Sequence, residues 1–155
     1  MRMVHAIRFE QKLPVDKDTL WTFVASPLNL RLITPEYMNF KVTSELKQAV
    51  MYPGMMITYK VSPLFNIPLN WCTEITHVEE GAYFVDEQRQ GPYRIWHHEH
   101  HLKEISGGTL MTDILHYQLP LGPIGELAHA LFVKKQLKNI FDFRYKKLEV
   151  IFGKM

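Results

Sequence analysis

Four histidines crowd one short stretch of the sequence, where residues 96–101 read Trp-His-His-Glu-His-His. Alternate residues of a β-strand share a face, so Trp96, His98 and His100 would point the same way in a strand. The tryptophan makes that face the better candidate for the protein interior. Imidazole titrates near neutral pH and is a common metal ligand. The inward histidines are therefore candidates for proton transfer, for metal binding or for holding a polar group of a ligand.

One carboxylate is expected to face these histidines. In residues 111–119, the face that carries Asp113 is otherwise apolar apart from the hydroxyl of Tyr117. Residues 106–108 read Ser-Gly-Gly and predict a tight hairpin turn, which would place Asp113 opposite His100 or one pair away. An inward carboxylate is costly unless it is paired, so we predict that Asp113 contacts the histidines.

Three kinds of site fit His98, His100 and Asp113. The first is a buried hydrogen-bond network that fixes the sheet and offers polar anchors to a ligand. The second is acid–base catalysis by an Asp113–His100 or Asp113–His98 pair, with these three residues as the candidate catalytic groups. The third is a metal site of two histidines and one carboxylate, a pattern that is easily matched by chance. We adopt the first interpretation and expect no metal and no cofactor.

The elements that must position these residues are a series of strands followed by one long helix. Alternating apolar residues predict strands at 4–13, 40–46, 55–62, 69–76, 83–88, 93–104 and 109–119. Short helices are expected after the first strand, beginning at Asp16 and Pro27. Apolar residues at three- and four-residue intervals predict a helix from Pro123 to about Phe152, with a stripe formed by Leu127, Ala130, Leu131, Leu137, Phe141, Tyr145, Leu148 and Phe152. Such a stripe needs an apolar groove, which a twisted antiparallel sheet can form.

Composition narrows the class of protein. The 155 residues predict one domain spanning 1–155, and 46% apolar with 22% charged residues is ordinary for a soluble globular protein. A net charge of +2 without a basic cluster argues against nucleic-acid binding. The single cysteine fits a reducing compartment, and the sequence shows neither a signal peptide nor a stretch of membrane-spanning length. A cytoplasmic protein without a transmembrane segment is expected.

The order of elements resembles the helix-grip fold of the START-like (SRPBCC) superfamily, which includes the birch-pollen-allergen and polyketide cyclase/dehydrase families. Three segments are similar to a bacterial subgroup of that superfamily: Thr34-Pro35-x-x-Met38-Asn39-Phe40, the stretch from Phe84 to His100 with its Gly91-Pro92-Tyr93 and Trp96-His97-His98-x-His100 motifs, and Gly108-Thr109-Leu110-Met111-Thr112-Asp113. The resemblance implies an α+β fold in which a curved antiparallel sheet of six to seven strands wraps around the C-terminal helix. It also implies an apolar pocket for lipids, sterols, polyketides, quinones or hormones, with catalysis in some branches only.

We therefore predict a non-enzymatic protein that binds a small hydrophobic or amphipathic ligand, of lipid, polyketide, quinone or aromatic type. Apolar walls with a few converging polar groups are typical of such pockets. The predicted ligand-binding residues are Tyr59, Trp71, Trp96, His98, His100, Asp113, Tyr117, Phe141 and Tyr145. Two other hypotheses are a cyclase- or dehydratase-like enzyme that uses the Asp–His pair, and a protein–protein interaction module.

Several further residues bear on these hypotheses. Lys134 falls inside the apolar stripe and is either a lysine that reaches water or a cationic anchor for a ligand carboxylate. Phe132 and Phe143 lie opposite the stripe and predict either a homodimer contact or a covering loop. The apolar hairpin 63–68 is expected to act as a lid or a docking surface. Asp86, with its charged neighbours near the Gly91-Pro92 turn, is expected at the surface.

Overall fold

An antiparallel sheet with a helix packed along it forms the body of the protein. The computed structural model describes residues 3–46, 48–63 and 65–155. Within these residues, seven strands form one sheet in the order β1-β7-β6-β5-β4-β3-β2, and every neighbouring pair is antiparallel. The strands are β1 (His5–Leu13), β2 (Lys41–Val42), β3 (Met55–Val61), β4 (Leu69–Glu79), β5 (Tyr83–Gln90), β6 (Ile95–Ile105) and β7 (Gly108–Gln118). Each predicted strand is present, although β2 is much shorter than the predicted segment 40–46.

Short helices connect β1 to β2. They are α1 (Lys17–Val24) and the 3-10 helices η1 (Pro27–Ile33) and η2 (Glu36–Met38). The predicted start of α1 is confirmed, because the carboxylate of Asp16 accepts a hydrogen bond from the backbone N–H of Thr19 at 2.8 Å. This cap satisfies an N–H group that the first helical turn cannot use. The connection places η1 against the C-terminal helix, on the face of the sheet that the helix covers.

The turn between β6 and β7 sets the register of the central strands. Gly107 adopts a φ of 81°, which a side chain would disfavour, and the turn pairs Ile105 with Gly108. Gly108 itself has no room for a Cβ, which would overlap the carbonyl oxygen of Leu13 at the end of β1. Continuing along the ladder, this register places His100 directly opposite Asp113.

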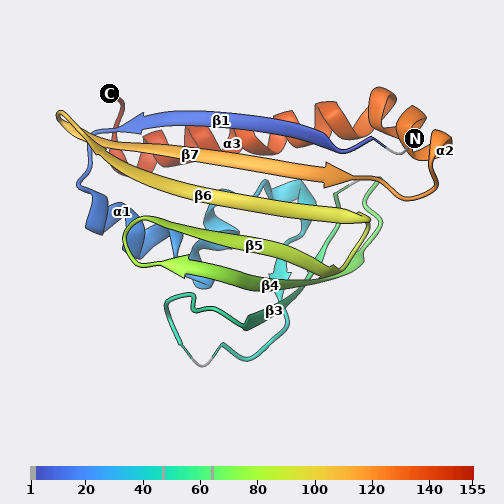
Figure 1. Ribbon diagram of the computed structural model, residues 1–155, viewed down its shortest axis with the longest axis horizontal. Helices are drawn as coiled ribbons and strands as arrows, with labels where there is room; N and C mark the ends of the chain where they lie inside the picture. The colour runs from blue at the N-terminus through green and yellow to red at the C-terminus, as the bar shows by residue number, and fades with distance from the viewer. Residues whose placement is uncertain (1–2, 47, 64) are drawn as a thin grey trace.

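The C-terminal helix is continuous but not uniform. It consists of α2 (Pro123–Ala128), a π-helical segment η3 (His129–Val133) and α3 (Lys134–Phe152). Figure 1 shows α3 lying along the sheet behind β1 and β7, with α2 beside the start of β1. At this end, α2 and β1 are joined by a 2.9 Å contact between Glu126 and His5 Nε2. None of the helices in the described ranges is long and apolar enough to cross a membrane.

The prediction that the first part of the apolar stripe is buried is wrong. Leu137, Phe141 and Leu148 are buried as expected, but Leu127 and Leu131 are 61% and 59% exposed. The π-helical segment widens one turn, so the spacing that aligns residues along α3 does not continue into α2. The residue buried at this point is Val133, which the stripe did not include.

The apolar hairpin lies beside the helix. Leu64, one of its residues, is outside the described part of the chain. Phe65 is exposed, and its ring centre lies 5.9 Å from that of Phe132 in an edge-to-face arrangement. The hairpin and the helix therefore touch through two aromatic rings that both remain accessible to water.

The interior packs as three hydrophobic clusters. One joins α1 to β3–β6 and includes Leu20, Ile57 and Phe84. A second lies between β7 and the helix around Leu115 and Leu137, and a third surrounds Met38, Val61 and Trp71. The cavity described next lies where the three clusters meet, because residues from each of them line it.

Candidate ligand-binding cavity and its polar ring

A cavity of about 140 Å³ lies between the sheet and α3. Aliphatic and aromatic side chains form most of its wall, among them Ile57, Trp71, Phe84 and Leu137. An apolar cavity of roughly 150 Å³ can hold benzene, so this space accepts a group about the size of one aromatic ring.

The structure places most of the predicted binding residues at this cavity. Tyr59, Trp71, Trp96, His98, His100 and Asp113 line it. Tyr117, Phe141 and Tyr145 are not among its lining residues.

These three side chains lie elsewhere for separate reasons. The hydroxyl of Tyr117 is 2.8 Å from His129 Nε2, because β7 carries this residue past the cavity to the η3 segment. Phe141 stacks on Phe9 of β1, with ring centres 4.2 Å apart, and Tyr145 is exposed. Both belong to the side of α3 that covers β1.

Two carboxylates and two imidazoles form a closed ring in the cavity wall. His98 and His100 come from β6, Asp113 from β7 and Asp86 from β5. Asp113 Oδ1 lies 3.0 Å from His98 Nε2 and 2.9 Å from His100 Nδ1. Asp86 Oδ2 lies 2.7 Å from His100 Nε2 and 3.5 Å from His98 Nδ1. Each acid therefore contacts both histidines, and all four side chains are largely buried.

The two histidines differ in how readily they bind a proton. Both nitrogens of His100 lie within hydrogen-bond distance of a carboxylate, so both can donate. Burial alone would lower the pKa of His100, but the hydrogen bonds to Asp113 and Asp86 outweigh it and the pKa is raised. Burial and the neighbouring His100 lower the pKa of His98. The surroundings therefore favour protonation of His100 over protonation of His98.

The pKa values of the two carboxylic acids are both lowered. Burial by itself would raise the pKa of Asp113, yet hydrogen bonds from His100 and His98 hold it far below the usual range. Burial alone would also raise the pKa of Asp86, but its hydrogen bond with His100 and the neighbouring imidazoles outweigh burial and the pKa is lowered. Both carboxylates are therefore ionised near neutral pH.

The prediction that Asp86 lies at the surface is wrong. It pairs with His98 across β5 and β6 and points to the cavity, where its Oδ1 accepts a hydrogen bond from Trp96 Nε1 at 3.1 Å. The alternation of β5 contained the signal, since Asp86 follows the buried Phe84 by two residues. The charged residues around it concealed that pattern.

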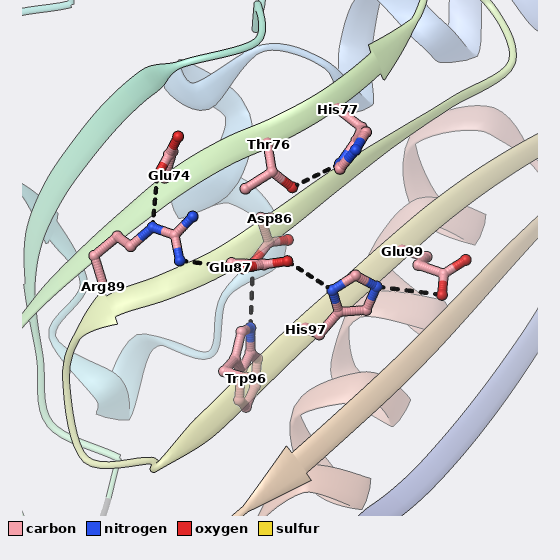
Figure 2. A network of polar contacts seen from close by, with 9 residues as sticks. All are labelled: Glu74, Thr76, His77, Asp86, Glu87, Arg89, Trp96, His97 and Glu99. Atoms are coloured by element: carbon pink, nitrogen blue, oxygen red, sulfur yellow. Dashed lines mark hydrogen bonds and ion pairs between the residues drawn. The ribbon is translucent and has the colours of Figure 1, made fainter.

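The other face of the same strands carries a second polar network (Figure 2). His97 Nδ1 lies 2.9 Å from Glu87, and His97 Nε2 lies 3.4 Å from Glu99. Arg89 joins Glu87 to Glu74 on β4. These residues alternate with those of the ring, so strand geometry separates two networks of similar composition.

Arg144 is the functional candidate that the sequence interpretation missed. It lines the cavity, its Nε is buried without a hydrogen-bond partner in the described part of the chain, and its guanidinium carbon lies 5.4 Å from the Phe141 ring centre. Its spacing from Phe141 and Leu148 could have identified it, because three- and four-residue steps put it on their face. Lys134, which was considered as a cationic anchor, is exposed.

Trp71 has a similar unpartnered donor. Its Nε1 is buried without a hydrogen-bond partner among the described residues, and the side chain lines the cavity. Its ring stacks on Tyr59, with centres 5.9 Å apart. The cavity wall therefore includes two side chains with N–H groups that no described residue satisfies.

An antiparallel sheet, a long C-terminal helix packed along it and a cavity between them define the helix-grip fold, and solved structures confirm it. A protein from Chromobacterium violaceum has a TM-score of 0.71, with 12% identity over 97% of this chain and 98% of its own. Ara h 8.0201, of the birch-pollen-allergen type, has a TM-score of 0.62, with 16% identity over 94% and 98% of the two chains. Major latex-like protein 151 from Panax ginseng has a TM-score of 0.66, with 9% identity over 96% and 97%. At these identities the likeness establishes the predicted α+β fold. No protein-family model matches the chain, and no curated protein does either.

Proposed function

We propose that this protein binds a small amphipathic ligand, with an apolar body and an oxygen-bearing head group, in the cavity between the sheet and α3. One observation carries the proposal: in a mainly apolar cavity, Trp71 Nε1 and Arg144 Nε are buried donors without a partner among the described residues. A buried donor left unsatisfied costs about 1–3 kcal/mol. A ligand oxygen would remove that cost on binding.

The head group that fits best is a carboxylate or another acidic group. Within the described residues, no Asp or Glu oxygen lies within 4.0 Å of the Arg144 guanidinium. Arginine recognises planar anions through paired hydrogen bonds, whereas a neutral alcohol offers it much less. The apolar body would pack against the aromatic walls. Lipid, polyketide, quinone and aromatic compounds that carry such a group fit this description, and the resemblance to the START-like superfamily supports the same class.

Isothermal titration with matched ligands tests this function. The probes are aryl-alkyl carboxylates with a single ring and the alcohols of the same carbon skeletons. Arg144→Met should weaken carboxylate binding roughly 10- to 100-fold, since a hydrogen bond to a charged group contributes about 1.5–3 kcal/mol. Alcohol binding should change less than about twofold, well below the energy of one hydrogen bond.

Lys134→Met is the matched control, because it removes a positive charge from the same helix at an exposed position. It should leave both ligand series unaffected. Equal loss of carboxylate affinity in the two variants, or no binding of either series to the unaltered protein, would contradict the proposal.

A further inference from the structure

We propose that Asp86, His98 and His100 form a binding site for one divalent transition-metal ion, with Asp113 and Trp96 orienting the three ligands. This site differs from the set of His98, His100 and Asp113 considered from the sequence, because Asp86 replaces Asp113 as the carboxylate ligand. It does not depend on the proposed organic ligand.

The three donor atoms already lie close together. One donor atom from each of Asp86, His98 and His100 lies within 4.8 Å of the other two. Asp86 Oδ2 is 2.7 Å from His100 Nε2 and 3.5 Å from His98 Nδ1. Two donors bound at 2.0–2.1 Å to one ion are roughly 2.9–3.4 Å apart in octahedral or tetrahedral geometry. Small side-chain adjustments would therefore bring the ligands into place.

The outer hydrogen bonds of the ring involve the other polar atoms of the three ligands. Asp113 Oδ1 faces the remaining nitrogen of each histidine, Nε2 of His98 and Nδ1 of His100. If those nitrogens carry the protons, the lone pairs of the other two turn toward Asp86. Trp96 Nε1 donates to Asp86 Oδ1, and a bound ion would take the place of the hydrogen bond that now joins Asp86 Oδ2 to His100 Nε2. Metal-binding histidines and carboxylates are commonly held by outer hydrogen bonds of this kind.

The charges of the ring also favour a bound divalent cation. Asp113 is buried and Asp86 is largely buried, and the basic side chains within 4.0 Å of them in the described part of the chain are histidines, without a lysine or arginine. The two carboxylates bring two negative charges into this part of the cavity wall. A divalent ion between neutral histidines balances both carboxylates, which reduces the cost of burying them.

The donor set selects the class of metal. Two imidazoles and one carboxylate suit Zn²⁺, Fe²⁺, Co²⁺ or Ni²⁺, whereas Mg²⁺ and Ca²⁺ prefer oxygen ligands. All three ligands line the cavity, so remaining coordination positions would face it. Water or an oxygen of a bound molecule could occupy those positions.

Cobalt and zinc titrations of the full chain, stripped with a chelator, test the site. Visible absorption of Co²⁺ reports its coordination, and equilibrium dialysis with Zn²⁺ gives stoichiometry and affinity. We expect one equivalent to bind with micromolar or tighter affinity. His98→Ala, His100→Ala and Asp86→Asn should each weaken binding at least 100-fold and remove the Co²⁺ spectrum.

Matched variants separate ligands from neighbouring groups. His97→Ala and His101→Ala remove histidines from the outer face of the same strand and should leave binding unchanged. Asp113→Asn should retain one equivalent but weaken binding roughly 10- to 100-fold, the effect expected for an outer hydrogen-bond partner. His129→Ala tests the other cluster with suitable geometry, His5, Glu126 and His129, and should have no effect.

Circular dichroism in the presence of chelator checks that each variant folds. If an alanine variant does not fold, His98→Asn or His100→Gln replaces it. The proposal is overturned if the unaltered protein binds neither metal at micromolar concentration. It is also overturned if folded His98 and His100 variants bind as tightly as the unaltered protein.

Discussion

Strand β6 presents two pairs of histidines to two different environments. The side chains of His98 and His100 are 5% and 12% exposed on the inner face, whereas those of His97 and His101 are 34% and 38% exposed on the outer face. Their shortest distances to carboxylates are nearly equal, 2.7–3.0 Å inside and 2.8–2.9 Å outside. Distance therefore does not distinguish the two pairs, and burial does.

The comparison shows how one local pattern produces two roles. On the outer face, water can replace a lost partner, so each ion pair contributes little to stability. On the inner face, a lost partner leaves a buried charge without compensation. Breaking the inner ring is therefore costly, and its four side chains also line the cavity.

The largest expected effect comes from Asp113→Ala. It removes the acceptor shared by His98 and His100 and should lower the free energy of unfolding by about 3–5 kcal/mol. Denaturant unfolding in the presence of chelator measures the change. Glu99→Ala is the outer-face control and should cost at most about 1 kcal/mol. Similar losses for the two variants would remove the distinction between the faces.

Trp96→Phe should have an intermediate effect. It keeps an aromatic ring in the cavity wall but removes the hydrogen bond to Asp86 Oδ1. Because the acceptor is charged and largely buried, the expected loss is about 1.5–3 kcal/mol of unfolding free energy. A variant as stable as the unaltered protein would show that Asp86 finds another donor, which a comparison in the Asp86→Asn background would detect.

The smallest effect is expected for the outer pair of His97 and Glu87. A double-mutant cycle with His97→Ala and Glu87→Ala should give a coupling energy of about 0.2–1 kcal/mol. Added salt should reduce it further, since screening acts on exposed charges. A coupling energy as large as that of His100 with Asp113 would refute the role given to burial.

The sequence predicted the parts of the site that local rules determine. The Ser-Gly-Gly turn pairs His100 with Asp113, and strand alternation turns His98 inward. The same rule would have placed Asp86 inside, but its charged neighbours favoured a surface position.

Other features depend on packing that periodicity does not describe. The π-helical turn of η3 changes which side chains α2 buries, and no spacing rule indicated it. Arg144 has the spacing of a buried residue, but its unpartnered Nε becomes apparent only when the whole cavity wall is assembled.

The polar ring and the rest of the cavity also differ in how far apart their residues lie in the chain. Asp86, His98, His100 and Asp113 come from three consecutive strands that two turns connect, β5, β6 and β7. Trp71 and Arg144 lie on β4 and α3, and meet at the cavity only after the C-terminal helix has packed against the sheet. Contacts between residues close in sequence close smaller loops and form faster. The ring is therefore formed by one local segment of the chain, and the cavity is completed around it by the C-terminal helix.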